Sequence, residues 1–156
     1  MENIRFYPPH IQPFAYEPTR DNFEIISNIN VGEGIITKRH FYKGEIVYRF
    51  TGELLNYQTL FTLQKTNGEY IHDPYFMGKT LHCCDPNTDC DMTTLTFTAR
   101  RDIMPGEYIT MDYDSTEEEL YRSFFCQCGS LNCRGWIKGY KFHRVPLENQ
   151  TRAYAI

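Results

Sequence analysis

The chain has 156 residues, a length typical of one domain with its own hydrophobic core. Its apolar and charged fractions are ordinary for a globular protein, and its twelve Tyr and eleven Phe fit either an aromatic-lined pocket or a β-rich core. The net charge of −4 argues against general affinity for nucleic acid, which needs clustered Lys and Arg. We therefore expect no direct nucleic-acid binding, and a cationic partner such as a lysine-rich peptide suits this charge.

The cysteine content and the first residues predict an intracellular protein. The opening MENIRFYPPH has no basic start followed by an apolar run, so we expect no secretory signal. No stretch approaches eighteen consecutive apolar residues, so we expect no membrane span. Six cysteines without a secretory signal favour a reducing compartment and metal ligation over disulfides. We expect the protein in the nucleus or cytoplasm and not secreted.

Residues 1–22 are predicted to form an irregular arm. Pro8, Pro9, Pro13 and Pro18 exclude a continuous helix or a central strand there. Between the prolines lie four aromatic residues, Phe6, Tyr7, Phe14 and Tyr16. We expect these rings to dock the arm on the domain surface, and covering a substrate groove is the alternative.

From residue 23 onward, short runs rich in β-branched and aromatic residues alternate with turn signals, which predicts a mostly β domain of short strands. The predicted strands are FEIIS (23–27), VGEGIIT (31–37), IVYRF (46–50), MTTLTFTAR (92–100) and YITMDY (108–113). Turns are predicted at KGE (43–45) and MPGE (104–107).

Two segments predict the small α component of this fold. Residues 56–65 are expected to form a helix with Asn56 as its N-cap. The run STEEE (115–119) resembles a capping box that leads into Leu120 and Tyr121, and acidic residues suit the first turn of a helix.

Three cysteines share one short loop with two glycines, CQCGSLNCRG (126–135); they are Cys126, Cys128 and Cys133. A closed zinc site takes four ligands in a tetrahedron, so a fourth ligand is needed. Cys84 is the best of the remaining cysteines, Cys83, Cys84 and Cys90, because Pro86 makes the turn that follows it rigid. The alternative is a set of unrelated buried thiols.

Four motifs stand in order along the chain. They are Gly32-Glu33-Gly34-Ile35, His82-Cys83-Cys84-Asp85-Pro86-Asn87, the segment ARRDIMPGEYITMDY at 99–113, and the cysteine loop at 126–135. They are similar to the G-x-G, the Asn-His-Ser-Cys-x-Pro-Asn, the strand–turn–strand ending in Asp-Tyr and the post-SET motif of SET-domain protein-lysine methyltransferases. The resemblance covers about residues 22–140 and identifies the chain as a member of this family.

The resemblance implies the SET-domain fold: short strands in several small sheets, a pseudoknot in which residues 80–87 thread beneath a nearby loop, and a C-terminal zinc-binding post-SET loop. The implied organisation is an arm at 1–22, a SET domain at 23–122, a post-SET zinc segment at 123–142 and a tail at 143–156. We expect a monomer.

The resemblance also implies the chemistry, in which a neutral lysine amine of a protein attacks the methyl group of S-adenosylmethionine. A free lysine has a pKa of about 10.4, and a narrow channel beside the positive sulfonium favours the neutral amine. Tyr113 matches the family's catalytic tyrosine, whose hydroxyl orients the amine. Tyr70 is the second catalytic candidate, as a channel wall, with core packing as the alternative. A histone tail is one substrate of this class.

The implied cofactor-binding residues are Gly32, Glu33, Gly34, Leu81, His82 and Trp136. Gly32, Glu33 and Gly34 are expected near the methionine end of the cofactor, where glycine permits close approach. His82 is expected to present its backbone to the adenine. Trp136 either stacks on the adenine or packs as a tail residue. The implied zinc ligands are Cys84 with the three cysteines of the post-SET loop.

Two departures from the family pattern keep other functions open. Leu81 replaces an Asn whose amide contacts the cofactor, and losing a hydrogen bond to a charged group costs about 1.5–3 kcal/mol. Met111 replaces the usual Phe or Tyr two residues before the catalytic Tyr, so the number of methyl groups added is not predicted. One alternative is a degenerate domain that binds a peptide or partner without chemistry. Another is an enzyme for a small molecule, with Tyr113 and His82 as polar groups of its pocket.

Overall fold

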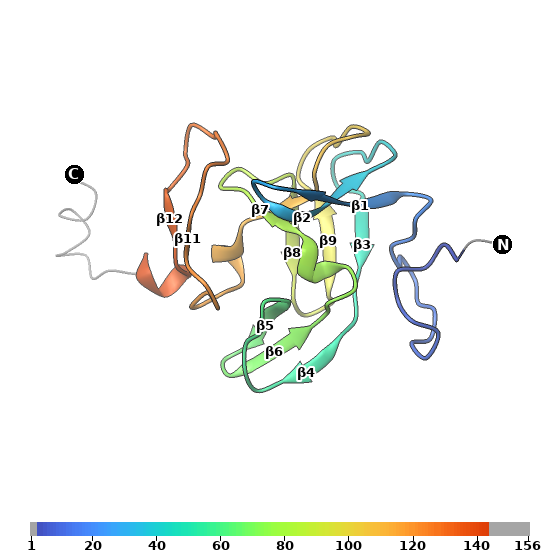
Figure 1. Ribbon diagram of the computed structural model, residues 1–156, viewed down its shortest axis with the longest axis horizontal. Helices are drawn as coiled ribbons and strands as arrows, with labels where there is room; N and C mark the ends of the chain where they lie inside the picture. The colour runs from blue at the N-terminus through green and yellow to red at the C-terminus, as the bar shows by residue number, and fades with distance from the viewer. Residues whose placement is uncertain (1–2, 144–156) are drawn as a thin grey trace.

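The computed structural model describes residues 3–143, and within them the chain folds into twelve short strands and three 3-10 helices (Figure 1). The strands are β1 Phe23–Asn28, β2 Gly32–Thr37, β3 Ile46–Arg49, β4 Glu53–Leu55, β5 Thr62–Thr66, β6 Glu69–His72, β7 Leu81–His82, β8 Thr88–Asp91, β9 Thr96–Ala99, β10 Thr110–Met111, β11 Phe124–Phe125 and β12 Trp136–Ile137. The 3-10 helices are η1 Met77–Lys79, η2 Tyr113–Ser115 and η3 Tyr140–Phe142. The mostly β fold class is therefore confirmed, and in residues 3–143 its helical part consists of these short turns. In the same range no helix is long and apolar enough to cross a membrane.

The strands form five small sheets, as expected for the SET fold. Two sheets have three antiparallel strands, in the orders β3-β9-β8 and β4-β6-β5. β1 with β2, and β11 with β12, form antiparallel pairs, while β7 and β10 pair in parallel. In Figure 1 the β11–β12 pair stands apart from the other sheets, at the opposite side from the N-terminal arm.

The strand predictions are confirmed at β1, β2 and β3, with ends that differ by one residue or less. The strand expected at 92–100 is wrong in its first half, because residues 92–95 form the turn between β8 and β9. Leu95 turns the chain there with a positive φ of 55°, which its apolar side chain did not signal. The strand expected at 108–113 shortens to Thr110–Met111.

Both helix predictions are wrong. Residues 56–61 form a loop, and β5 follows because its first three side chains are buried and its backbone pairs with β6. At the second site η2 ends at Ser115, where a helix was expected to start. The acidic run after it is held against β5, because the Glu117 carboxylate accepts a hydrogen bond from the Gln64 backbone N–H at 2.8 Å. Tertiary contacts thus override the local capping pattern in both segments.

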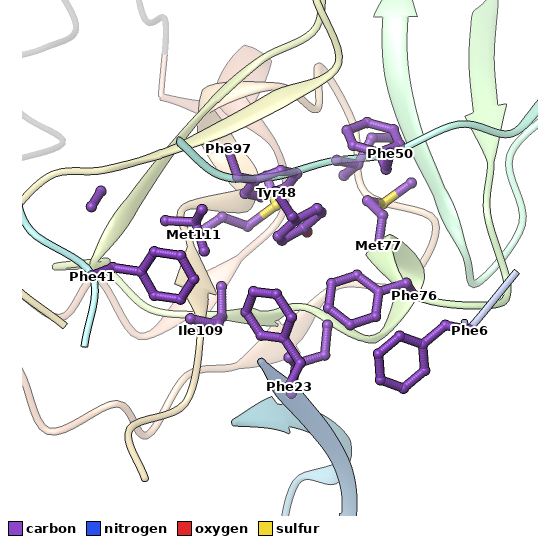
Figure 2. Close-up of a cluster of buried hydrophobic side chains, with 14 of the residues drawn as sticks. Phe6, Phe23, Phe41, Tyr48, Phe50, Phe76, Met77, Phe97, Ile109 and Met111 are labelled. Carbon is purple, nitrogen blue, oxygen red and sulfur yellow. The ribbon is translucent and has the colours of Figure 1, made fainter. Parts of the chain in front are cut away.

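The main core is aromatic and lies between the β3-β9-β8 sheet, β1 and η1 (Figure 2). Tyr48 is at its centre: it stacks on Phe97 at 4.4 Å and meets Phe76 edge-on at 4.8 Å. Phe23 stacks on Phe41 at 5.7 Å and meets Phe76 edge-on at 5.2 Å. Many of the Phe residues therefore belong to the core of a β-rich domain.

The N-terminal arm is docked on this core. The rings of Phe6 and Tyr7 are buried, and Phe6 packs on Phe76 at 4.9 Å. The Tyr7 hydroxyl donates a 2.7 Å hydrogen bond to the buried Asp73 carboxylate. That carboxylate also accepts from three backbone N–H groups, those of Tyr75, Phe76 and Met77. Docking is thus the correct expectation for the arm, and none of its residues from 3 to 22 lines the cavity described below.

The contact between Tyr7 and Asp73 predicts a stability effect. Tyr7→Phe removes one donor from a buried carboxyl, so we expect a loss of about 1–3 kcal/mol in the free energy of unfolding. Urea unfolding followed by tryptophan fluorescence measures this loss. Tyr57→Phe is the matched control because the Tyr57 side chain is exposed, and it should change stability by less than about 0.5 kcal/mol. Equal effects of the two substitutions would contradict the role given to the Tyr7 hydroxyl.

Candidate active site and metal centre

A cavity of about 430 Å³ lies between β2, β5, η1, β7, β10 and the segment that follows η2. This volume is within the usual range of small-molecule sites. Among the residues that line it are Gly32, Glu33, Leu81, Met111, Tyr113 and Glu117. The cavity thus gathers residues from two of the four motifs singled out in the sequence, together with Leu81, which directly precedes the motif at 82–87.

The parallel pair β7–β10 positions the inner wall of the cavity. Leu81 lies opposite Thr110, His82 lies opposite Met111, and the Cys83 backbone N–H donates to the Met111 carbonyl at 2.9 Å. Both Leu81 and Met111 line the cavity, and Met111 is also part of the main core (Figure 2). The tyrosine that follows β10 is therefore set beside the residues of β7.

Asn87 fixes this arrangement from the next turn. Its side-chain amide donates to the Tyr108 carbonyl at 2.8 Å and accepts from the Thr110 backbone N–H at 2.9 Å. Its own backbone N–H donates to the Thr110 hydroxyl at 3.0 Å. The segment from Leu81 to Asn87 is thereby tied to residues 108–111. The threading of residues 80–87 beneath a loop stays a prediction.

Tyr113 begins η2, and its hydroxyl donates to the Thr80 carbonyl at 2.6 Å. Its ring packs between those of His82 and Phe124, at centroid distances of 5.1 and 6.0 Å. Burial, together with the nearby Glu117 charge, raises the pKa of Tyr113 well above its ordinary value of 10.0, so the phenol is neutral. With its proton directed to Thr80, the oxygen has lone pairs left to accept a hydrogen bond from a bound group.

His82 connects Tyr113 to the cysteine cluster. Its Nδ1 accepts the Tyr113 backbone N–H at 3.0 Å, so the ring proton is on Nε2, which lies 3.4 Å from the Cys84 sulfur. Burial lowers the pKa of His82, which keeps the ring neutral. The imidazole does not line the cavity, so its contacts are those of a positioning group.

Two residues of the G-x-G motif line the cavity, and the third packs closely against neighbouring side chains. Gly32 and Glu33 line the cavity, and the Glu33 carboxylate pairs with Lys79 at 2.9 Å. Gly34 does not line it: a Cβ at this position would lie 2.8 Å from side-chain carbons of Leu81 and of Tyr108. The absent side chain of Gly34 therefore makes room for Leu81.

Two predicted site residues lie outside the cavity lining. Tyr70, on β6, is close to the acidic run 117–119, and partial burial and these charges raise the pKa of its hydroxyl. Trp136, on β12, is 56% exposed and packs edge-on against Phe125 at 5.8 Å. The structure does not bring them to Tyr113, and the roles assigned to both stay predictions.

Glu117 is a buried acidic residue of the cavity lining that the sequence did not indicate as a site residue. Its side chain is buried, with only 4% of the residue exposed, and it lines the same cavity as Tyr113. Burial raises the pKa of its carboxyl from 4.5 to about 7, while the hydrogen bonds from Gln64 and Thr116 act in the opposite direction. The sequence signal in this run, three consecutive glutamates, indicated a helix start and not a buried carboxylate.

The four predicted metal ligands come together. The sulfur atoms of Cys84, Cys126, Cys128 and Cys133 all lie within 4.8 Å of one another, and those of Cys84 and Cys126 are 3.9 Å apart. Four thiolates bound to one zinc in a tetrahedron lie about 3.8 Å apart, so the cluster fits this ion. Burial raises the pKa of the Cys84 thiol to about 11, so ionisation of this thiol needs a cation beside it.

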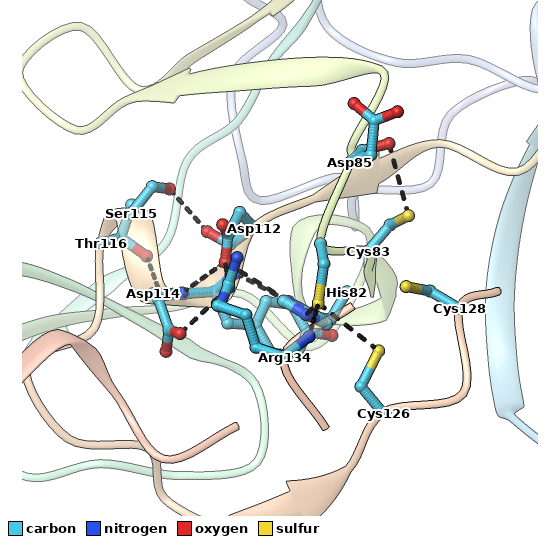
Figure 3. A network of polar contacts seen from close by, with 12 residues as sticks. His82, Cys83, Asp85, Asp112, Asp114, Ser115, Thr116, Cys126, Cys128 and Arg134 are labelled. Carbon is cyan, nitrogen blue, oxygen red and sulfur yellow. Dashed lines mark hydrogen bonds and ion pairs between the residues drawn. The ribbon is translucent and has the colours of Figure 1, made fainter. Parts of the chain in front are cut away.

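The segment that carries three of these cysteines is tied back to the end of β10 (Figure 3). Arg134 bonds the carboxylates of Asp112 and Asp114 at 2.6 and 3.0 Å, and its backbone N–H points at the Cys84 sulfur at 3.4 Å. The Gly139 N–H donates to Asp114 at 3.0 Å. The metal centre and the cavity therefore share a common support.

The family profile described as the SET domain matches residues 32–114, more than half of the chain. Methyltransferase flvH of Aspergillus flavus is 40% identical over 60 residues, which cover 37% of this chain and 34% of that protein. Histone-lysine N-methyltransferase Set2 of Drosophila melanogaster is 28% identical over 134 residues, 69% of this chain and 6% of that protein. The chain thus spans about a third or less of the length of these relatives.

Among solved structures, that of Arabidopsis thaliana SUVH6 in complex with SAM is similar, with a TM-score of 0.60 and 17% sequence identity. The similarity covers 77% of this chain and 34% of that one. At this identity the similarity shows a shared fold. The profile match lies within the predicted domain 23–122, whose boundaries stay predictions, as does the tail 143–156, of which only His143 lies in the described residues.

The buried carboxyl of Glu117 predicts a pH dependence of stability. Its pKa is about 7 in the folded state against 4.5 ordinarily, so the folded state binds more protons between these values. The contribution of the Glu117 carboxyl to the free energy of unfolding is full below pH 4.5 and is lost as the pH rises through 7. Glu117→Gln removes this titration, so between pH 4.5 and 7 the variant should gain about 3 kcal/mol relative to the native sequence. Urea unfolding at several pH values measures the difference, and a difference that stays constant across this range would contradict the assignment.

Proposed function

The chain belongs to the SET-domain family, and from this premise we propose that it is an S-adenosylmethionine-dependent methyltransferase that acts on a lysine side chain of a protein. The observation that carries the proposal is the placement of Tyr113, a neutral phenol that lines one cavity with Gly32, Glu33 and Leu81. The relatives named as methyltransferases and the fold shared with a SAM complex support it.

In this proposal Tyr113 orients the amine of the substrate. Its proton is directed to the Thr80 carbonyl, so the phenol oxygen accepts an N–H from the amine and fixes the direction of the nitrogen lone pair. Met111 fills the wall beside it with a flexible apolar side chain. The apolar surroundings exclude water and favour the neutral form of the amine.

We assign the donor to the side of the cavity formed by Gly32, Glu33 and Leu81. When bound, S-adenosylmethionine supplies an electrophilic methyl group on a positively charged sulfur. The Glu33 carboxylate provides negative charge at this wall, and Leu81 provides apolar contact in place of the family's amide. His82 is assigned a backbone contact to the adenine, and Trp136 a stacking contact.

We further propose that Cys84, Cys126, Cys128 and Cys133 bind one zinc ion. A closed set of four thiolates holds zinc for structure and leaves no position open for catalysis. The ion would join the turn after β7 to the β11–β12 segment. That segment also supplies Phe124, which lines the cavity and packs on the Tyr113 ring.

The proposed substrate is a lysine-containing protein or peptide, a histone tail among them. Several relatives are named histone-lysine N-methyltransferases, of Drosophila melanogaster and Homo sapiens for example, which supports this class and a nuclear or cytoplasmic location. The net charge of −4 suits a basic peptide. The monomeric state expected from the sequence stays a prediction.

The role of Tyr113 predicts a separation of binding from turnover. Tyr113→Phe should lower methyl transfer to mixed basic proteins by about 100-fold or more, because the amine loses its orienting hydroxyl. Calorimetry should show the affinity for S-adenosylmethionine changed by less than about threefold. Undiminished transfer would refute the role of this hydroxyl. No binding at millimolar donor would rule out the methyltransferase proposal, and peptide binding without turnover would favour a binding module.

The metal centre predicts one zinc per chain by elemental analysis of the purified protein. Cys133→Ser should lower the zinc content by more than half and destabilise the protein, because a structural zinc contributes to folding. Cys83→Ser is the matched control, since this neighbouring thiol lies outside the cluster and should leave the zinc content unchanged. Absence of zinc from the native protein, or full zinc content in Cys133→Ser, would contradict the assignment.

A further inference from the structure

One of the residues that line the cavity is a buried acid to which the proposed function gives no role. Glu117 lines the cavity together with Tyr113 and is 4% exposed. Within residues 3–143 no Lys, Arg or His forms an ion pair with it: Lys79 pairs with Glu33 and Lys141 pairs with Glu119. A buried carboxylate without a cation is costly in free energy, so its presence at this wall needs a reason.

The carboxylate is held rigidly. Its Oε2 accepts the Gln64 backbone N–H at 2.8 Å, and the Gln64 side chain in return accepts the Glu118 N–H at 2.9 Å. The Glu117 backbone N–H donates to the Tyr113 carbonyl, and its carbonyl accepts from the Tyr140 N–H, both at 2.9 Å. Glu117 therefore keeps a fixed position relative to the catalytic tyrosine.

A purely structural role does not account for the charge. A glutamine at position 117 would accept the same bond from Gln64 through its amide oxygen and would place no charge in the cavity. The residue is a glutamate although burial raises the pKa of its carboxyl to about 7. A group with a pKa near 7 is suited to take up and release a proton near neutral pH.

The groups that face Glu117 from neighbouring elements do not neutralise it. They are Tyr113 of η2, Tyr70 of β6 and Cys90 of β8, and burial raises the pKa of all three above its ordinary value. They are therefore uncharged near neutral pH. The adjacent Glu118 and Glu119 add negative charge outside the cavity lining. Within residues 3–143 the cavity lining has one other carboxylate, Glu33, which pairs with Lys79, and one further charged residue, Arg122. A cation that enters the cavity would therefore meet one carboxylate without an ion-pair partner, Glu117, beside a neutral phenol.

We propose that Glu117 is a catalytic residue that binds the ammonium group of the substrate and accepts its proton. The substrate class of this cavity is then a primary amine that enters as a cation. This inference rests on the proposed methyltransferase function. An N–H bond of the ammonium breaks, its proton forms an O–H bond on the carboxylate, and the electron pair stays on nitrogen. The neutral amine, held by the Tyr113 oxygen, then uses this pair to form the new N–CH₃ bond.

The remaining charges of the reaction balance. The S–CH₃ bond of the donor breaks, and its electron pair stays on sulfur as the neutral thioether of S-adenosylhomocysteine. The methylated amine leaves with one positive charge. The proton on Glu117 passes to solvent, which restores the carboxylate for the next cycle. Tyr113 stays protonated throughout, because its own proton remains on the bond to Thr80.

The first test measures Glu117 without any methyl transfer. Carbon-13 NMR of protein labelled at the Glu carboxyl carbons, with Glu117→Gln to assign the signal, follows the titration of this group. The probe is n-butylamine, which mimics a lysine side chain, and 1-butanol is the uncharged control. We expect the amine at about 100 mM to shift the titration of Glu117 to lower pH, because a cation favours the carboxylate. A titration that butylamine does not shift, or that butanol shifts equally, would overturn the proposal.

The second test uses turnover. Glu117→Gln keeps the bond to Gln64 and should lower kcat/KM for a lysine-rich peptide by about 100-fold at pH 7. This loss should shrink as the pH rises towards about 10.4, where the free amine loses its proton without help. Glu119→Gln, which removes an exposed charge, is the matched control and should lower kcat/KM less than threefold.

The outcomes separate the two proposals. Transfer that depends on Tyr113 but has the same rate and pH profile in Glu117→Gln would overturn the role of Glu117 and leave the methyltransferase function standing. A native protein that binds no donor would overturn the methyltransferase function. In that case, the NMR titration with butylamine still decides whether the cavity of Glu117 accepts a cationic amine.

Discussion

The site depends on a single parallel contact, two residues long on each side, between Leu81–His82 and Thr110–Met111. It joins segments that are about thirty residues apart in the sequence. The residues just before β7 and just after β10 form the neighbouring parts of the site. Before β7 lies Thr80, whose carbonyl receives the Tyr113 hydroxyl, and after β10 lies Tyr113 itself. A pair this short is weak alone, so Asn87 and its hydrogen bonds to residues 108 and 110 are needed to hold it.

The same contact couples the cavity to the cysteine cluster. His82 belongs to β7, receives the Tyr113 backbone N–H and turns its other nitrogen toward the Cys84 sulfur. Arg134 completes the connection from the opposite side through Asp112 and Asp114. A zinc ion bound by the cysteines, as proposed above, would not touch substrate. It would fix the position of the segments that carry Tyr113, because hydrogen bonds around a metal site orient both the ligands and their neighbours.

The local sequence was sufficient to predict those features whose physical cause lies in neighbouring residues. The apolar runs predicted the first three strands, and the rigid turn at Pro86 with the cysteine spacing predicted the four thiols that cluster. Tyr113, by contrast, was identified through the resemblance of the Asp-Tyr ending to the SET-domain family. The local sequence failed where the decisive contact is distant: Glu117 is bound by Gln64, 53 residues earlier, and residues 56–65 follow the pairing of β5 with β6. Gly34 shows the same limit, since the space it leaves is filled by side chains from β7 and from Tyr108.

The proposed placement of donor and amine in the cavity is tested most directly by a crystal structure of the chain with S-adenosylhomocysteine bound. It predicts the homocysteine portion against Gly32, Glu33 and Leu81, with the sulfur on the Tyr113 side of the cavity and Glu117 on the wall left for the amine. A ligand bound elsewhere on the chain, or a cavity in which its sulfur is out of reach of Tyr113, would contradict it.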